Sequence, residues 1–202
     1  MWISELSRRT GVPVATIKYY LREDLLPAGE STGATRAVYD DSHVRRLRLI
    51  RALTGSGGLS LATVHEVLAT LDEPAVGTHS VLGSAQYGLG PAAPQPTDAS
   101  RRRVDDLLGR IGWTVHVDAP ARAALAAALD ALDAVDNELP DDLLETYAEA
   151  VGKIGKAEVT SLPDDPAAAL ERAVVVTVLG EPVLLALRRL AQENASAERY
   201  GY

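Results

Sequence analysis

The sequence has 202 residues, no cysteine and a formal net charge of −8, and 47% of its residues are hydrophobic. The length suffices for one domain or two small ones, and the lack of cysteine excludes disulfides, thiolate metal sites and thiol redox sensing. No apolar run reaches the roughly 18 residues that a membrane helix needs, and the charged N-terminal turns do not fit a signal peptide, so we expect a soluble, cytoplasmic protein without a membrane partner.

The charge is unevenly distributed along the chain. Residues 1–72 contain nine Lys and Arg against eight Asp and Glu, a net of +1, whereas residues 73–202 contain eleven against twenty, a net of −9. The acidity therefore belongs to the C-terminal part, and a basic surface on the N-terminal part is compatible with the composition.

Two short amphipathic helices are predicted at the start of the chain. Ser4 can cap the first, which ends at Gly11, and the second runs from near Pro13 to about Glu23. Two helices joined by a short turn that contains glycine are typical of a helix-turn-helix. The apolar side chains that recur on one face of these helices are Ile3, Leu6, Val12, Val14, Ile17 and Leu21.

The next segments predict a small hairpin and two more helices. Residues 28–39 are rich in turn formers and indicate a β-hairpin or wing that ends with Arg36 and Tyr39. Asp40, Asp41 and Ser42 supply N-cap residues for a third helix, glycines at 55–58 interrupt it, and residues 60–72 form a fourth. The expected inward positions are Val44, Leu47, Ile50 and Leu53, followed by Leu61, Val64, Val67, Leu68 and Leu71.

This order of segments resembles the DNA-binding domain of the MerR family of transcriptional regulators. The stretches that carry the resemblance are ISELSRRTGV, PVATIKYYLREDLLP, the wing, YDDSHVRRLRLIRAL and GGLSLATVHEVL, over residues 1–72. The resemblance implies a winged helix-turn-helix and a homodimer on double-stranded DNA at a pseudo-palindromic promoter site. It also implies RNA polymerase as a partner at the promoter and activation by distortion of promoter DNA.

The second helix of a helix-turn-helix enters the major groove by its N-terminal part, which sets the candidate DNA contacts. Lys18 can reach a guanine or a phosphate, and the Tyr19 hydroxyl can bind a phosphate. For both tyrosines a place in the core is the alternative, and for the arginines an ordinary solvated face. The candidates are Ala15, Thr16, Lys18, Tyr19 and Tyr20 on the helix, Arg36 and Tyr39 at the wing, and Arg9 and Arg46.

The remaining sequence predicts a linker, residues 73–100, that contains one short helix, followed by an all-α domain, residues 101–202. The predicted apolar stripe of one helix is Leu125, Ala128, Leu132 and Val135, and that of the next is Leu144, Tyr147, Val151 and Ile154. A last helix starts at Asp165-Pro166 and is expected to break at Gly180-Glu181-Pro182. Glycines and prolines after residue 72 prevent a long helix there, so we expect residues 141–160 or 166–194 to form the dimer.

No catalytic constellation is recognisable, and neither a cofactor nor a metal is expected. The four histidines lack ligand spacing, and the glycine run at 55–58 lacks the strand and lysine of a phosphate loop. The protein is therefore predicted to be a regulator and not an enzyme, and one hypothesis is control by a small-molecule effector of the C-terminal domain. The alternative is a ligand-independent repressor or architectural protein whose helical domain only dimerises. Candidate pocket residues, with plain core packing as the alternative for each, are Tyr87, Trp113, His116 and Tyr147.

Overall fold

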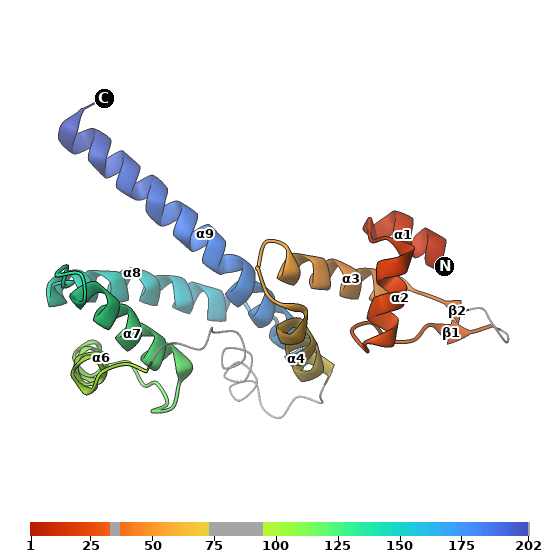
Figure 1. The fold of residues 1–202 in the computed structure, drawn as a ribbon, viewed down its shortest axis with the longest axis horizontal. Coiled ribbons are helices and arrows are strands. Elements are labelled where there is room, and N and C mark those ends of the chain that lie inside the picture. Colours follow the sequence, from red (N-terminus) through yellow and green to blue (C-terminus); the bar gives the residue numbers. More distant parts are fainter. Residues whose placement is uncertain (33–36, 73–94, 202) are drawn as a thin grey trace. The chain divides into compact units, whose positions relative to one another are not determined.

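The structure is a computed structural model that describes residues 1–32, 37–72 and 95–201 (Figure 1). These residues form eight helices and one two-stranded sheet, which confirms the predicted mainly α fold. The chain divides into two compact units, one made of Met1–Ala75 with Leu170–Tyr202 and the other of Val76–Ala169. From Leu170 on, the last helix therefore groups with the N-terminal residues and not with the rest of the predicted domain of residues 101–202.

The helix-turn-helix consists of α1 (Ile3–Thr10) and α2 (Val14–Arg22). The prediction that Ser4 caps α1 is wrong, because Ser4 lies inside the helix and Trp2 occupies the N-cap without a side-chain cap. Gly11 ends α1 in the left-handed conformation with φ of 68°, which a residue without Cβ adopts freely.

A tight turn follows α2 and returns the chain to the core. The amides of Leu25 and Leu26 both donate to the carbonyl of Tyr20, and both leucine side chains are buried. The turn requires a positive φ at Asp24, which has φ of 55°. This φ lies in the left-handed region, where the Cβ atom of a non-glycine residue comes too close to the backbone. The conformation is therefore less favourable for Asp24 than it would be for glycine.

The predicted wing is an antiparallel ladder of β1 (Glu30–Ser31) and β2 (Ala37–Val38), in which Glu30 faces Val38. Gly29 comes directly before it, and a Cβ there would lie 2.7 Å from the carbonyl oxygen of Val38 and 3.0 Å from the Tyr39 ring. Only glycine therefore lets the two strands meet at this point. Arg36 lies outside the described residues.

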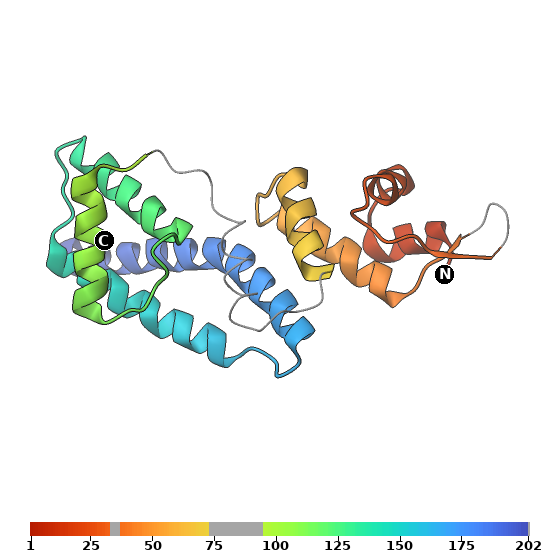
Figure 2. The same ribbon diagram turned by 90° about the horizontal axis from the view of Figure 1, so that it is seen from below.

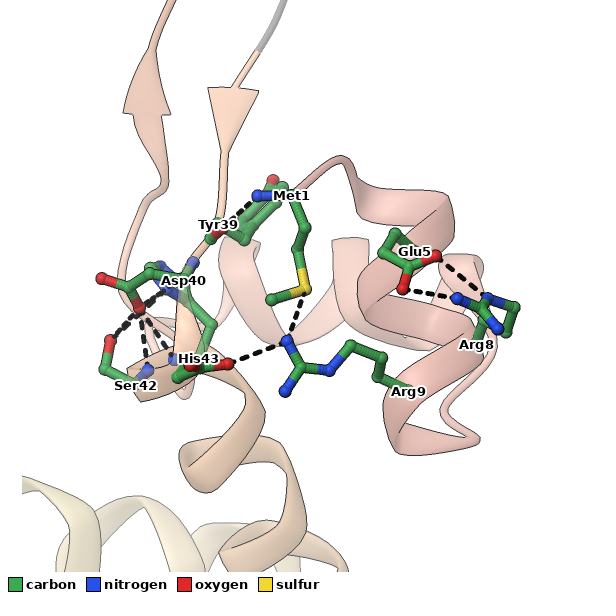
Figure 3. Close-up of polar contacts among 9 residues, drawn as sticks. Met1, Glu5, Arg8, Arg9, Tyr39, Asp40, Ser42 and His43 are labelled. Carbon is green, nitrogen blue, oxygen red and sulfur yellow. Dashed lines mark hydrogen bonds and ion pairs between the residues drawn. The ribbon is translucent and has the colours of Figure 1, made fainter.

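Helix α3 (Asp41–Thr54) begins at a capping box, as Figure 3 shows. The Asp40 carboxylate accepts hydrogen bonds from the amides of Ser42 and His43, at 2.9 and 3.3 Å, and from the Ser42 hydroxyl. The His43 Nδ1 atom lies 2.8 Å from the same carboxylate oxygen. Hydrogen bonds from the side chains of Ser42 and His43 hold the pKa of Asp40 well below its usual range.

Helix α4 (Leu61–Asp72) completes the helices of the DNA-binding sequence. The predicted inward residues of α3 are all buried, and so are Val64, Val67 and Leu68 of α4. Leu61 was expected inside but is exposed, because it is the first residue of its helix. The fully buried side chains of the N-terminal core include Leu6, Ile17, Leu26, Leu47, Ile50, Leu53, Val64 and Leu68.

Three helices form the second unit: α6 (Asp98–Ile111), α7 (Pro120–Asp133) and α8 (Asp141–Thr160), seen together in Figure 2. Their core consists of Val104, Leu107, Ala126, Leu129 and Leu144. The predicted stripe of α7 is only partly right: Leu125 packs against this core, but the buried residues are Ala126 and Leu129, and Val135 lies exposed beyond the helix. Because α7 is largely alanine and leucine, several of its faces are apolar enough to be buried, and packing against α6 selects one of them.

Ion pairs and caps fasten the helices of this unit to one another. Arg103 of α6 binds the side chain of Asp141 at 2.8 Å and the carbonyl of Leu139. At the other end of the core, Asp130 of α7 accepts hydrogen bonds from the amide and hydroxyl of Thr97, the N-cap of α6, both at 2.7 Å. These contacts join residues more than thirty positions apart, so they set how the three helices pack.

The last helix, α9, runs without interruption from Pro166 to Tyr200. The predicted break at 180–182 is wrong, because Pro182 is accommodated inside the helix. A helical proline forfeits one backbone hydrogen bond but has a φ that suits the helix, so continuous packing can retain it. Within the first unit, Val178 lies so close to Gly57 that a Cβ on this glycine would be 2.4 Å from its Cγ1 atom.

The left-handed residue at the end of α2 gives a stability prediction. Asp24→Gly should raise the free energy of unfolding by about 0.5–1 kcal/mol, because glycine adopts this φ without strain. Asp24→Ala should lower it by about 1 kcal/mol, since alanine lacks the polar side chain that tolerates this region. Chemical denaturation followed by circular dichroism measures both, and equal stability of the two variants would contradict the assignment of strain.

The cap of α3 gives a pH prediction. Because the folded pKa of Asp40 is below the unfolded value of 3.8, its contribution to stability is present above that pH and is lost as the pH falls. Asp40→Asn keeps a capping oxygen but cannot titrate, so its thermal unfolding should depend less on acid than that of the wild type. Asp40→Ala should lower the melting temperature already at neutral pH. An unchanged acid dependence in Asp40→Asn would show that this carboxylate is not the titrating group.

Candidate nucleic-acid interface

One face of α2 is exposed and carries the side chains that could touch DNA. Ala15, Lys18, Tyr19 and Arg22 are exposed, and their spacing of three and four residues puts them on one stripe of the helix. Ile17 is fully buried on the opposite side. Thr16 is half-buried at the edge of the stripe. The structure therefore brings together Ala15, Lys18 and Tyr19 from the sequence analysis.

Arg22 was missed by the sequence analysis. Its guanidinium carbon lies 5.5 Å from the centroid of the Tyr19 ring, within the range of a cation–π contact, and its Nε atom lies 3.6 Å from the Glu23 carboxylate. The signal was present in the sequence, because Arg22 is four residues after Lys18 and three after Tyr19.

The two adjacent tyrosines have different environments. Tyr19 is 37% exposed, whereas Tyr20 is only 8% exposed. Burial raises the pKa of the Tyr20 hydroxyl, and the neighbouring Tyr19 adds to the shift. The ring centroids are 6.0 Å apart at an angle of 55°, so the buried ring supports the exposed one.

Tyr39 is also buried and belongs to the base of the wing. Its amide donates to the carbonyl of Met1 at 2.8 Å, and its ring meets the ring of His43 edge-on with centroids 5.1 Å apart. Figure 3 shows this cluster beside the cap of α3. Tyr39 therefore holds the hairpin to the start of α1 and α3 in the unbound chain.

Two of the candidate arginines are bound to acidic side chains. Arg46 is 13% exposed and donates to both oxygens of Asp72, at 2.8 and 2.5 Å, and to the Leu25 carbonyl at 3.1 Å. Arg9 lies 2.8 Å from the Asp41 carboxylate and remains 40% exposed. Arg46 is thus committed to the fold, whereas Arg9 keeps an accessible guanidinium.

Helix α3 carries two further exposed cations outside the predicted set of DNA contacts. Arg45 and Arg48 are exposed, and neither makes a hydrogen bond or ion pair with another residue in the described part of the chain. They are three residues apart and so lie on one side of α3.

The candidate pocket residues do not converge. Trp113 borders a groove on α8, whereas Tyr147 lies on α8 outside that groove and His116 is exposed beside Asp118, with 3.8 Å between Nδ1 and the carboxylate. Tyr87 lies outside the described residues. Among residues 1–32, 37–72 and 95–201 there is no cluster of His, Asp or Glu that could hold a metal ion. Within the same ranges, no helix is both long and apolar enough to cross a bilayer.

Comparison with known proteins agrees with this geometry. Residues 1–71 match the family described as MerR HTH family regulatory protein. No curated protein matches the chain. Among solved structures, the crystal structure of the "putative transcriptional regulator SCO5550 from Streptomyces coelicolor A3(2)" is similar over 100% of this chain and 99% of its own, with 37% identity and a TM-score of 0.76. The chain therefore belongs to the MerR family of helix-turn-helix transcriptional regulators and is a DNA-binding protein.

Proposed function

We propose that the chain regulates transcription as a homodimer on a pseudo-palindromic promoter site, with α2 of each copy in the major groove. The observation that carries this proposal is the exposed stripe of α2. It combines a free ammonium, an aromatic hydroxyl and a guanidinium on a helix whose other face is anchored in the core. A major groove accepts one α-helix, and base edges present acceptors to such groups.

Each side chain of the stripe has its own part in this proposal. Lys18 makes no hydrogen bond or ion pair with another described residue, so its ammonium is available for a guanine or a phosphate. Ala15 and Thr16 present methyl groups to a thymine methyl. Tyr19 donates its hydroxyl to a phosphate, and Arg22, stacked on the Tyr19 ring, neutralises a neighbouring phosphate.

Of the remaining candidate residues, some would contact DNA directly and others would hold the DNA-contacting elements in place. Arg9 and the Arg45–Arg48 pair are exposed cations beside the helix-turn-helix and would bind phosphates. Arg46, Tyr20 and Tyr39 act from inside by holding α2 and the wing in place. For Arg36, which directly precedes β2, we keep the proposal of a phosphate contact from the wing tip.

Dimerisation is supported by the second half of α9. Val183, Leu187 and Leu190 are 57%, 58% and 61% exposed and follow the four-three spacing of a coiled-coil seam, which Asn194 continues. We infer that a second copy covers this seam, because soluble monomers rarely leave a contiguous apolar surface exposed. The seam also repeats the spacing that pairs two helices in a coiled coil. Helix α8 is the weaker candidate, since Leu144 of its predicted seam is buried in the core of its own unit.

The direction of regulation and its trigger are further parts of the proposal. RNA polymerase is the partner at the promoter, and the family resemblance favours activation by DNA distortion. In one version of the proposal, a small-molecule effector binds to the part of the chain after α4 and controls regulation. The alternative is a ligand-independent repressor or architectural protein. It would be favoured if no compound in a panel of metabolites changed the melting temperature of the protein.

The DNA-binding proposal predicts distinct effects for two cations of α2. On a duplex selected from genomic DNA, Lys18→Ala should lose about 1–3 kcal/mol of binding free energy if Lys18 contacts a base. Arg22→Ala should weaken specific and random duplexes alike and reduce the salt dependence of binding by about one unit of slope. Fluorescence anisotropy at several salt concentrations measures both. Arg8→Ala is the matched control, because Arg8 is exposed, lies on α1 and is paired with Glu5. Wild-type affinity and slope in both α2 variants would remove α2 from the interface.

The dimer proposal predicts the behaviour of two leucines on one helix. Leu187→Glu should weaken dimerisation by about a hundredfold or more, because each copy loses a buried leucine worth roughly 1.5–3 kcal/mol. Leu185→Glu, at a position that is 51% exposed but lies off the seam, should leave the dimer intact. Sedimentation velocity of the full chain separates the two outcomes. A monomeric wild type, or equal loss in both variants, would contradict a seam on α9.

A further inference from the structure

The second unit contains a groove of about 510 Å³ that no part of the DNA-binding proposal uses. One side of the groove is formed by the end of α6 and by Trp113, which follows the cap residue Gly112. The other side is one face of α8. Its apolar lining comes from Ile111, Trp113 and Ala148. Its size falls within the range of roughly 300–1,000 Å³ that is usual for small-molecule sites.

The indole of Trp113 is held over α8 by the local backbone. Gly112 caps α6 with φ of 70°, and the Trp113 amide donates to the Leu108 carbonyl at 3.0 Å, so the chain turns back toward α8. A Cβ on Gly152 would lie 2.9 Å from the Cζ2 atom of Trp113. Glycine inside a helix is destabilising compared with alanine, and here it makes room for the ring. Trp113 as a residue is still 41% exposed and lines the groove.

One cation of the groove is already neutralised. Arg110 donates from Nε to Glu145 at 2.6 Å and lies 3.4 Å from Asp141. The hydrogen bond to Glu145 raises the pKa of the Arg110 guanidinium, as expected of a group committed to an acid. This pair closes one side of the groove and contributes no net charge.

Two other cations of the groove have no such partner. Lys153 and Lys156 line it from successive turns of α8, and neither ammonium makes a hydrogen bond or ion pair with another residue that the structure describes. Glu149 is the remaining acid of the lining. Apart from the Arg110–Glu145 pair, the lining therefore has two ammonium groups against one carboxylate. The chain has only one other lysine, Lys18.

We propose that this groove binds a small aromatic carboxylate. The flat ring lies on the open surface of Trp113, above Ile111 and Ala148, and the carboxylate reaches the ammonium groups of Lys153 and Lys156. Stacking on an indole favours a planar body, and charge-assisted hydrogen bonds at one end fix its direction. A cation over the indole, held by Glu149, is the opposite chemistry and would be revealed by the same experiment.

This inference deepens the effector part of the proposed function, since it rests on the idea that the helical unit receives a ligand. Binding is nevertheless measured without DNA. If the groove does not bind the carboxylate, operator binding by α2 is unaffected, and if α2 does not bind an operator, the groove can still bind its ligand.

Nuclear magnetic resonance of the ¹⁵N-labelled full chain tests the proposal. The chain has two tryptophans, Trp2 and Trp113, and Trp113→Phe assigns their indole N–H signals. We expect 2-naphthoate to shift the Trp113 signal in a saturable way and to leave the Trp2 signal in place. The neutral 2-naphthamide should bind about tenfold more weakly, because it lacks the charge that strengthens the hydrogen bonds.

Variants locate the site and guard against indirect effects. Lys153→Gln and Lys156→Gln should each weaken 2-naphthoate binding about five- to tenfold, while Lys18→Gln, the matched control, should not change it. Gly152→Ala should displace the indole without unfolding α8, because alanine favours a helix, and should also weaken binding. Equal binding of the acid and the amide, an unchanged affinity in both groove lysine variants, or stronger binding of 2-naphthylmethylammonium than of 2-naphthoate would overturn the proposal.

Discussion

The geometry of the DNA-binding unit depends on two arginines of α3 that hydrogen-bond to backbone carbonyl groups at or just after the C-terminal ends of α1 and α2. Arg51 donates to the Thr10 carbonyl at the end of α1, at 2.8 Å, and Arg46 donates to the Leu25 carbonyl after α2, at 3.1 Å. A helix end leaves carbonyl groups without partners, and a cation placed there both satisfies them and complements the helix dipole. Helix α3 thereby fixes the angle at which α2 presents its exposed face.

This arrangement explains how a chain with a net charge of −8 can belong to a DNA-binding family. Attraction to phosphates depends on the local field and not on the sum of charges, and the field falls within about 8–10 Å at physiological salt. Arg45, Arg48, Lys18 and Arg22 are exposed in the N-terminal unit. Three arginines of α6 and α7 are instead used within their own unit, where Arg103, Arg110 and Arg122 each bind an acid.

In the second unit, arginine side chains also fix how the helices pack, but they bind carboxylates of neighbouring helices and leave a groove between α6 and α8. Three of its arginines form ion pairs that orient three helices around a small leucine and alanine core. Its two lysines lie beside an exposed indole and make no ion pair with another residue that the structure describes. Exposed ion pairs add little stability one by one, so their main effect here is to select the packing among helices whose alanine-rich faces are nearly equivalent. The groove is a consequence of that packing, since Trp113 can lie on α8 only where Gly152 leaves room.

The sequence by itself determined the local elements of this protein. Apolar spacing, glycines and caps predicted α1 to α4, the hairpin and the exposed Lys18 and Tyr19, because these signals act within one or two helical turns. Only the tertiary structure decided that Arg46 is bound to Asp72, that Tyr20 and Tyr39 are buried, and that Ala126 is fully buried in the α6–α8 core while Leu125 packs against its edge. It also decided that Pro182 stays inside one helix. These outcomes depend on partners far away in the chain, and no local pattern of residues encodes which of several possible partners a side chain will meet.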